Sequence, residues 1–236
     1  MKLYEYLEEC TVKKTGAVIY ITGGGGKTTL MESFGEYLKN RGYSVLLTTT
    51  TKVASPKQHN YRTDKVFGDE SVLGYMPKKG ESVFFADHSY DIKKWIAPRM
   101  EVLSLLNKRY DIVLIEADGS KGLPFKYHTE RDPVVYDDAT AVIAVCGIWG
   151  IGSKAYEMCF GDGRECIIDK RYMDEYLRDS EGLTKGMRNN TKNLILFNGA
   201  DEVDSSVLEM LSSLELPKSV KGVIGSERDG SLYGTI

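Results

Sequence analysis

The most constraining feature of this chain is the stretch of residues 17–30, AVIYITGGGGKTTL. An apolar run typical of a β-strand leads into four glycines, which are followed by Lys27, Thr28, Thr29 and a helical pattern. Glycine adopts backbone angles that a Cβ atom forbids, so phosphate can approach the main chain closely at such a loop. The N–H groups of the loop and of the first helical turn then face the anion at the positive end of the helix dipole. The order of strand, glycine loop and helix therefore predicts a nucleotide-phosphate site.

Each residue type in this loop has its own expected role. Lys27 places a positive charge at the β- and γ-phosphates, and the Thr28 hydroxyl coordinates Mg²⁺. The expected cofactors are therefore Mg²⁺ and a nucleoside triphosphate, either ATP or GTP. The residues predicted to bind the nucleotide in this loop are Gly23, Gly24, Gly25, Gly26, Lys27, Thr28 and Thr29.

The loop departs from the common pattern G-x-x-x-x-G-K-[ST] at one position. Aligned on Gly26, Lys27 and Thr28, the pattern requires glycine at position 21, where this chain has Ile21. The form ITGGGGKTT is similar to the loop of the Mur ligases, which also begins with an apolar residue followed by Thr-Gly. An ATP-dependent ligase or kinase that acts on a small acceptor therefore stays open as an alternative.

Apolar runs farther along the chain predict strands that are buried on both faces, as in a parallel sheet. They span 111–117, 140–145 and 193–197. Helical patterns alternate with the strand patterns, and 236 residues suit one large α/β domain. We expect a single P-loop nucleotide-binding domain over 1–236, with a three-layer, P-loop NTPase-like α/β fold in which helices flank a mostly parallel sheet. The other expected elements are helices over 3–10, 27–41, 97–109, 169–178 and 203–214, and strands over 17–22, 44–50, 65–67, 82–86 and 223–224.

Composition argues against several classes of partner. The net charge of −3 disfavours a broad surface for nucleic acid or for an anionic membrane, because both need excess positive charge. The N-terminal residues MKLYEYLEEC carry acids where a signal peptide needs an apolar segment, and no apolar run reaches transmembrane length. The four cysteines form no C-x-x-C pair, and the spacing of Cys159 and Cys166 fits no common zinc pattern. We therefore expect a cytoplasmic protein with reduced thiols that binds neither nucleic acid nor membrane.

Two acidic residues follow the apolar residues of the run at 111–117. Glu116 and Asp118 are two positions apart, and in an extended segment such residues point to the same side. Mg²⁺ that is bound to phosphates takes oxygen ligands, usually a hydroxyl and one or two carboxylates. The expected metal ligands are Thr28, Glu116 and Asp118, with Glu116 preferred because it directly ends the apolar residues. Asp118 is alternatively the residue that orients the attacking group, so the expected catalytic residues are Lys27 and Asp118.

Four consecutive threonines, residues 48–51, end the second expected strand and precede Lys52. Their hydroxyls suit phosphate oxygens or Mg²⁺, and Lys52 suits developing negative charge. Ordinary threonine enrichment in a strand is the alternative interpretation. Residues 52–64 are polar, contain Pro56 and lack periodicity, which predicts an exposed loop on the ligand-binding side of the sheet. The substrate or switch candidates here are Thr49, Thr50, Thr51 and Lys52.

The segment 119–133 is punctuated by glycine and proline and is mixed in charge. In a ligase or kinase this segment is expected to contact the acceptor. A lone histidine such as His128 is more typical of a surface or internally satisfied residue than of a catalyst.

Residues 198–201, Asn-Gly-Ala-Asp, stand at the end of an expected buried strand. They resemble the N-K-x-D motif with which GTPases read the base, although Gly199 replaces the lysine. We expect Asn198 and Asp201 to bind the nucleotide, because an aspartate there accepts two hydrogen bonds from guanine. The alternative is an ordinary strand-to-helix turn in which Asp201 lies near a helix start.

Several of these stretches together resemble the YqeC family, from about Gly16 to the C-terminus. The resemblance rests on ITGGGGKTTL, LLTTTTK, IEADGSKGLPFK followed by ERDPVV, CGIWGIG and LFNGADEVD. It implies a P-loop NTPase-like accessory protein that assists maturation or cofactor insertion of a selenium-dependent molybdenum hydroxylase. Its implied partners are that hydroxylase or a protein of selenium or molybdenum cofactor maturation. The site residues that it supports are 23–28 and 48–52 together with Glu116, Asp118, Ser120 and Lys121.

The sequence thus favours a Mg²⁺-dependent nucleoside triphosphatase. The ligase or kinase is one alternative, and a carrier or chaperone that binds nucleotide without hydrolysing it, and only switches a loop, is the other. The base preference and the oligomeric state stay open.

Overall fold

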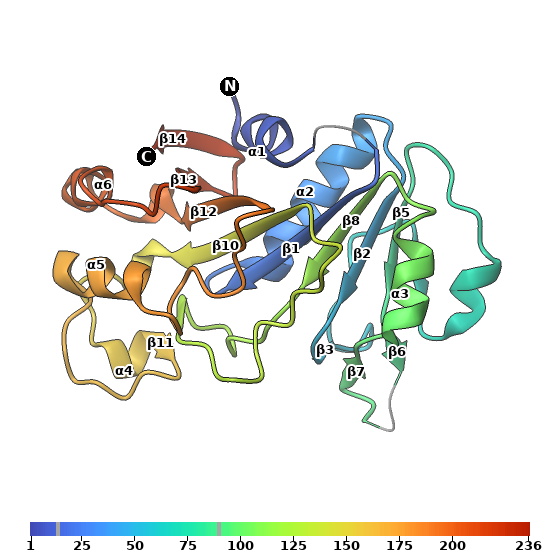
Figure 1. Cartoon of the computed structure of the whole chain (residues 1–236), viewed down its shortest axis with the longest axis horizontal. Coiled ribbons are helices and arrows are strands. Elements are labelled where there is room, and N and C mark those ends of the chain that lie inside the picture. Colours follow the sequence, from blue (N-terminus) through green and yellow to red (C-terminus); the bar gives the residue numbers. More distant parts are fainter. Residues whose placement is uncertain (13–14, 89–90) are drawn as a thin grey trace.

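The structure is a computed structural model that describes residues 1–12, 15–88 and 91–236 (Figure 1). Within these residues the main sheet has nine strands in the order β14-β13-β12-β10-β1-β8-β2-β5-β4. Every neighbouring pair is parallel except β13 and β14, which confirms a mostly parallel sheet. The strands are β1 (Ala17–Gly23), β2 (Val45–Thr49), β4 (Lys65–Phe67), β5 (Ser82–Phe85), β8 (Ile112–Glu116), β10 (Ala141–Gly147), β12 (Lys192–Asn198), β13 (Val220–Ser226) and β14 (Ser231–Thr235).

Strand β1 lies in the middle of the sheet, between β8 and β10. All residues of these three strands are buried, which explains why they form nearly unbroken apolar runs in the sequence. The chain leaves β1 toward β2 on one side and later adds β10, β12 and β13 on the other. Open α/β sheets bind ligands outside the carboxyl ends of the strands where the order reverses in this way. The glycine loop directly follows β1 at that place.

Helices cover both faces of the sheet and complete three layers (Figure 1). On one face, Leu30 and Phe34 of α2 pack in one apolar cluster with Ile19 of β1. On the other face, α3 covers the part of the sheet around β8, β2 and β5, and α5 and α6 cover the part around β10 and β12. The helices are α1 (Leu3–Thr11), α2 (Lys27–Asn40), α3 (Met100–Leu106), α4 (Ala155–Met158), α5 (Lys170–Arg178) and α6 (Ser205–Ser212), with 3₁₀ turns η1 (Glu70–Gly74), η2 (Ile148–Gly150) and η3 (Ala200–Glu202).

Two small sheets supplement the main one. An antiparallel sheet is formed by β3 (Val53–Ala54), β7 (Lys94–Ile96) and β6 (Asp87–His88), and it lies beyond the end of β2 in Figure 1. A parallel pair is formed by β9 (Phe125–Lys126) and β11 (Cys159–Phe160). Such short strands leave no periodic pattern in the sequence.

The prediction of an exposed loop over 52–64 is confirmed only in part. Residues 55–64 form no helix or strand, but β3 begins at Val53, and both Val53 and Tyr61 are buried. The Tyr61 ring stacks on Phe84 of β5, with ring centroids 3.5 Å apart. The Tyr61 hydroxyl donates a hydrogen bond to the Ala54 carbonyl at 2.8 Å. A few apolar residues in a polar segment give no periodicity, so burial against the distant Phe84 cannot be recognised from the segment itself.

Other elements differ from expectation in their bounds. Helix α3 spans only Met100–Leu106 of the helix predicted over 97–109. At its N-terminal side, Pro98 disfavours helical backbone at Ala97. Strand β13 is longer than the predicted 223–224, and its antiparallel partner β14 is not anticipated. Gly222 and Gly225 interrupt the apolar run of β13 and shorten its sequence signal.

None of the helices in the described ranges has the length and apolar character that crossing a membrane requires. All four cysteines are free thiols. The described residues contain no group of three or more His, Cys, Asp or Glu side chains that is arranged to hold a metal ion.

Candidate functional site

The carboxyl ends of the central strands meet around the glycine loop. Glu116 at the end of β8 pairs in register with Ile21 of β1 and Thr49 of β2. On the other side of β1, Asn198 at the end of β12 pairs with Gly147 of β10. The parallel sheet therefore brings the predicted site segments to one edge, although they are far apart in sequence.

The glycine loop leaves the start of α2 open to an anion. Gly26, the N-terminal cap of α2, has φ of 114°, and no side chain caps the helix. The N–H groups of Gly23, Gly24 and Gly25 donate within the protein, to Asp118 Oδ2, Val145 O and Leu123 O. The first N–H groups of a helix have no intrahelical acceptor. The donors left for phosphate are therefore those of the first turn of α2, which begins at Lys27.

Lys27 and Asp118 form a buried ion pair. Lys27 Nζ lies 3.1 Å from Asp118 Oδ1, 2.6 Å from the Gly23 carbonyl and 3.3 Å from the Ser120 hydroxyl. Burial alone raises the pKa of Asp118, but the Lys27 charge and the hydrogen bond from His128 outweigh burial and lower this pKa to about 2. Asp118 is therefore ionised and compensates the Lys27 ammonium.

His128 completes this network from the far side of Asp118. Its Nε2 lies 2.7 Å from Asp118 Oδ2 and its Nδ1 lies 3.0 Å from the Gly182 carbonyl. Both partners accept hydrogen bonds only, so both ring nitrogens donate and the buried ring is an imidazolium. His128 is thus an internally satisfied residue, as expected.

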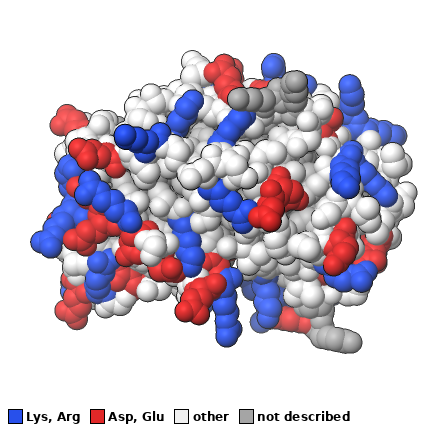
Figure 2. Space-filling view, in the orientation of Figure 1, with Lys and Arg blue, Asp and Glu red and all other residues white. Residues whose placement is uncertain are grey.

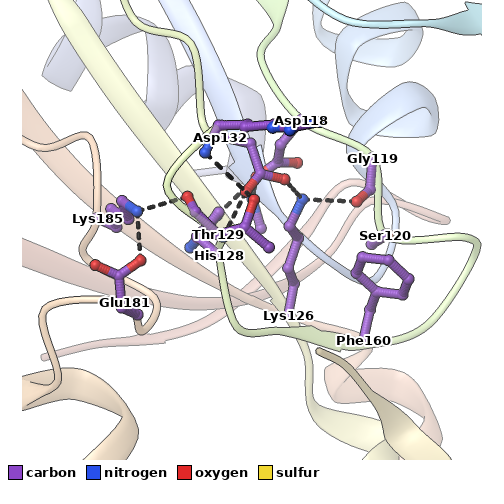
Figure 3. A network of polar contacts seen from close by, with 12 residues as sticks. Asp118, Gly119, Ser120, Lys126, His128, Thr129, Asp132, Phe160, Glu181 and Lys185 are labelled. Atoms are coloured by element: carbon purple, nitrogen blue, oxygen red, sulfur yellow. Dashed lines mark hydrogen bonds and ion pairs between the residues drawn. The ribbon is translucent and has the colours of Figure 1, made fainter. Parts of the chain in front are cut away.

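A second cation, Lys126, lies in the same network (Figure 3). Its ammonium contacts the Asp132 carboxylate and donates to the Gly119 carbonyl at 2.7 Å. These contacts fix the segment 119–133 next to the glycine loop.

The carboxylates of Glu116 and Asp118 do not face the same part of the molecule. Glu116 and Thr28 line a pocket of ≈ 400 Å³, whereas Asp118 is fully buried behind the loop. Strand β8 ends at Glu116, so the alternation of an extended strand does not reach Asp118.

Thr28 and Glu116 form the pair that fits a metal ion. The Thr28 hydroxyl donates to Glu116 Oε2 at 2.9 Å. Burial raises the pKa of Glu116, although the nearby Lys27 charge and the Thr28 hydrogen bond act in the opposite direction. A hydroxyl and a carboxylate that meet at the start of the helix supply the oxygen donors which Mg²⁺ shares with phosphates.

Several of the lysines predicted to belong to the site line this pocket. Its lining residues are Gly26, Lys27, Thr28, Thr29, Lys52, Val53, Ala54, His59, Tyr61, Lys94, Glu116, Gly119, Ser120, Lys121 and Gly122. Lys121 has φ of 51°, a conformation that side chains other than glycine rarely adopt. The excess of lysines over the single carboxylate suits an anionic ligand.

Within the 48–51 run, the hydroxyls of Thr49 and Thr50 contact the backbone rather than this pocket. The Thr49 hydroxyl donates to the Glu116 carbonyl at 2.9 Å, and the Thr50 hydroxyl donates to the Val134 carbonyl at 2.8 Å. Neither these residues nor Thr51 line the pocket. Lys52 is the one substrate or switch candidate of this run that the pocket includes.

Asn198 holds the loop from the other side. Its Nδ2 donates to the Gly25 carbonyl at 2.9 Å, and its Oδ1 accepts from the Glu227 N–H at 3.0 Å. Both polar atoms of the Asn198 side chain are therefore used within the protein. Asp201 lies nearby on η3, with Oδ2 3.9 Å from Arg228 Nη1.

A second, smaller pocket of ≈ 280 Å³ adjoins Asn198. Its lining residues are Thr29, Trp149, Asn198, Gly199, Asp201, Glu202, Ser226, Glu227 and Arg228. Thr29 lines both pockets, so both adjoin the first turn of α2. This arrangement fits a nucleotide whose phosphates lie by Lys27 and whose base lies near Asp201.

Sequence reasoning missed several residues of these pockets, among them His59, Tyr61, Trp149 and Glu227. His59 and Tyr61 belong to the segment 52–64, whose polar composition concealed them. Trp149 and Glu227 follow β10 and β13, and the ends of parallel strands in the sheet are the signal that points to them.

A broader groove of ≈ 880 Å³ runs along α5. Its charged side chains pair with one another, for example Lys170 with Asp174 at 2.9 Å and Arg171 with Glu175 at 3.1 Å. Figure 2 shows acidic and basic side chains intermingled at this end of the molecule. Charges that are already neutralised on the protein do not favour an ionic ligand, so the glycine-loop pockets are the better candidate site.

The comparisons with known proteins cover the glycine-loop part of this site. The family model described as YqeC protein matches residues 19–161, which include the loop, Glu116 and Asp118. The chain is 33% identical over 146 residues to "Uncharacterized protein YqeC" of Escherichia coli (strain K12), a match that covers 60% of this chain and 56% of that protein. The match thus spans little more than half the length of this curated relative. No solved structure matches the chain at a significant level.

Proposed function

The chain belongs to the YqeC family, and we propose that it binds a nucleoside triphosphate with Mg²⁺ and hydrolyses the terminal phosphate. The observation that carries the proposal is the meeting of Lys27, Thr28 and Glu116 at the uncapped start of α2. A positive charge, a hydroxyl–carboxylate pair and free helical N–H groups are the parts that triphosphate chemistry needs.

The proposal assigns a separate role to each residue of the site. The first-turn N–H groups and Lys27 stabilise charge on the phosphates, and Thr28 and Glu116 hold Mg²⁺. When bound, Mg²⁺ neutralises charge on the β- and γ-phosphate oxygens. Asp118 acts on Lys27, since its carboxylate is buried against that ammonium and does not line the pocket. Ser120, Lys52 and Lys121 line the same pocket, and the proposal assigns them to the terminal phosphate or to a second ligand.

The cellular role proposed here is cytoplasmic assistance in maturation or cofactor insertion of a selenium-dependent molybdenum hydroxylase. It rests on the family resemblance and on no contact in the structure. The partner in this role is the hydroxylase itself or another maturation protein.

One observation favours a second candidate, a ligase or kinase. The pocket of ≈ 400 Å³ extends beyond the glycine loop to Val53, Ala54 and Tyr61, which come from the small antiparallel sheet and its neighbouring segment. In this candidate function an acceptor occupies the part of the pocket beside those residues, next to the terminal phosphate. A carrier that binds nucleotide without turnover is the third candidate.

A direct experiment separates the three. Purified protein is incubated with Mg²⁺ and ATP, GTP or CTP, with and without candidate acceptors, and phosphate release and nucleotide affinity are measured. Steady release without an acceptor supports hydrolysis, release only with an acceptor supports the ligase or kinase, and tight binding without release supports the carrier.

The variant Lys27→Ala tests the site itself. We expect it to lower phosphate release about 100-fold or more, because one preorganised charge at a phosphate is removed. Lys39→Ala is the matched control, since Lys39 lies on the same helix but pairs with Asp64 at the surface. If Lys27→Ala binds and cleaves nucleotide like the parent protein, the proposed function is wrong.

A further inference from the structure

His59 lies beside the proposed metal pair and is held rigidly there. His59 lines the pocket of ≈ 400 Å³ together with Lys27, Thr28 and Glu116. Its Nε2 is 2.7 Å from Glu32 Oε1. The edge of the ring meets Tyr61, with centroids 4.7 Å apart and planes at 76°. Since Tyr61 is itself stacked on the sheet, the orientation of the His59 ring is set from two sides.

Glu32 is the residue that brings His59 to this position. It lies on α2 one turn after Thr28, so both side chains emerge from the same side of the helix. The Glu32 side chain is only 5% exposed, and Arg62 Nε donates to its Oε2 at 3.2 Å. A buried carboxylate requires such partners. His59 and Arg62 supply them, and the His59 ring is thereby tied to the helix that binds phosphate.

The contacts of the His59 ring determine which of its two nitrogens has a lone pair free to accept a proton. A carboxylate accepts hydrogen bonds only, so Nε2 of His59 carries the hydrogen that faces Glu32. In the neutral ring the other nitrogen, Nδ1, then has a free lone pair. Within the described part of the chain, Nδ1 forms no hydrogen bond that would occupy it.

Glu116 and Asp118, the acidic residues at the end of β8 and just after it, are both engaged in other contacts. Asp118 is paired with Lys27 and His128 and does not line the pocket. Glu116 accepts the Thr28 hydrogen bond and is the candidate carboxylate for Mg²⁺. That leaves His59 as the side chain of the pocket lining whose neutral form can accept a proton.

We propose that His59 is the general base of the reaction and that Glu32 positions it, an inference that rests on the proposed hydrolysis. Nδ1 takes a proton from the attacking water while the water oxygen forms a bond to the γ-phosphorus. The bond from the γ-phosphorus to the bridging oxygen breaks, and its electron pair leaves with the nucleoside diphosphate. Glu32 stabilises the imidazolium through Nε2, and the proton then passes to solvent.

The test measures single-turnover phosphate release and the affinity for a non-hydrolysable Mg²⁺-nucleotide analogue. His59→Ala should lower the rate about 100- to 1,000-fold and change the affinity less than about twofold, because a general base acts in the transition state. Added imidazole should restore the rate of His59→Ala in a concentration-dependent way. Glu32→Gln should lower the rate about tenfold without rescue by imidazole, since the base is present but the imidazolium is less stabilised. His88→Ala, on β6, is the matched control and should behave like the parent.

The outcomes distinguish the inference from the proposed function. If the parent cleaves nucleotide and His59→Ala cleaves it equally well, the inference is wrong and the proposed function stands. The inference is also wrong if His59→Ala mainly weakens analogue binding, or if imidazole restores none of the lost rate. If the parent binds nucleotide without releasing phosphate, the hydrolytic function fails, and the role of His59 fails with it.

Discussion

The Lys27 ammonium and the Asp118 carboxylate lie 3.1 Å apart, with side-chain exposures of 3% and 0%. Asp118 also accepts hydrogen bonds from Gly23 N–H and from the His128 ring. One carboxylate thus compensates two buried cations and holds the first residue of the glycine loop. The Lys27 charge, which the proposed function assigns to phosphate, is therefore held in place by contacts within the protein.

Replacing Asp118 with asparagine should strongly destabilise the fold. Asp118→Asn leaves Lys27 and His128 as buried, uncompensated cations, so we expect the free energy of unfolding to fall by about 3–5 kcal/mol. Urea denaturation followed by circular dichroism measures it. Asp64→Asn, which breaks the partly exposed pair with Lys39, should cost less than about 1 kcal/mol.

A double variant keeps this prediction testable if Asp118→Asn does not fold. Asp118→Asn combined with Lys27→Met removes one of the two stranded cations and should recover part of the lost stability. A loss for Asp118→Asn no larger than that for Asp64→Asn would contradict the assigned role of the pair.

Thr28 should determine how strongly nucleotide binding depends on Mg²⁺. Thr28→Val keeps the side-chain shape but removes the hydroxyl that meets Glu116 at 2.9 Å. We expect its affinity for nucleotide with Mg²⁺ to be about tenfold weaker than the parent's, with little further change when EDTA is added. Titration with a fluorescent nucleotide measures both affinities. Thr29→Val, next along the helix, should keep the parent's response to EDTA, and an equal loss of response in both variants would argue against a metal role for Thr28.

Gly199 should not tolerate any side chain. Its φ is 92°, and a Cβ there would lie 2.6 Å from the Trp149 ring. We expect Gly199→Ala to lower the free energy of unfolding by about 1–3 kcal/mol more than Gly152→Ala. Gly152 is the matched control because its φ is 89° and nothing lies within 4 Å of an added Cβ.

The variant Trp149→Ala locates the cause of this difference. In that background the extra cost of Gly199→Ala over Gly152→Ala should disappear, because the ring that opposes the Cβ is gone. An unchanged difference would mean that Trp149 is not responsible. Chemical denaturation of the four variants provides the comparison.

The sequence predicts the central part of this fold because its signals are local. Strands such as β8 and β10 are buried on both faces and therefore appear as apolar runs, and the glycine loop with Lys27 marks where β1 ends and α2 begins. The two-residue strand β3 and the closing strand β14 have no such signal, since short strands and exposed edges show little periodicity.

The site is predictable in its residue types but not in its pairings. Glu116 and Asp118 are only two positions apart in the sequence, yet they face different partners because β8 ends at Glu116. His59 meets Glu32 only because Tyr61 packs on the distant Phe84. Such contacts depend on which segments the sheet brings together, and a single sequence carries no direct record of that.

The Glu227 carboxylate should make stability fall as pH rises. It lies so close to Gly26 that a Cβ there would be 2.3 Å from its Oε1, and its Oε2 has no hydrogen-bond partner among the described residues. Burial, to which the charges of Asp201 and Glu202 add, raises the pKa of Glu227 to about 8.

The sign of the effect follows from proton binding. In the unfolded chain the pKa of a glutamate is about 4.3. Between about pH 4.3 and about pH 8, Glu227 in the folded protein therefore holds a proton that it has lost in the unfolded chain. The stabilising contribution is present in full below about pH 4, and it is lost as pH rises through the folded-state pKa.

Glu227→Gln removes the titrating group while keeping its shape, which isolates this contribution. The variant and the parent should have similar free energies of unfolding at pH 5, whereas at pH 9 the variant should be more stable by roughly 1–3 kcal/mol, because it buries no unpartnered charge. Urea denaturation at pH 5, 7 and 9 measures the difference, with the exposed Glu215→Gln as the control. Ionised Glu227 beside Gly26 should also repel phosphate, so nucleotide affinity should weaken toward pH 9 more in the parent than in Glu227→Gln. Parallel stability and affinity curves for parent and variant would show that Glu227 does not titrate in this range.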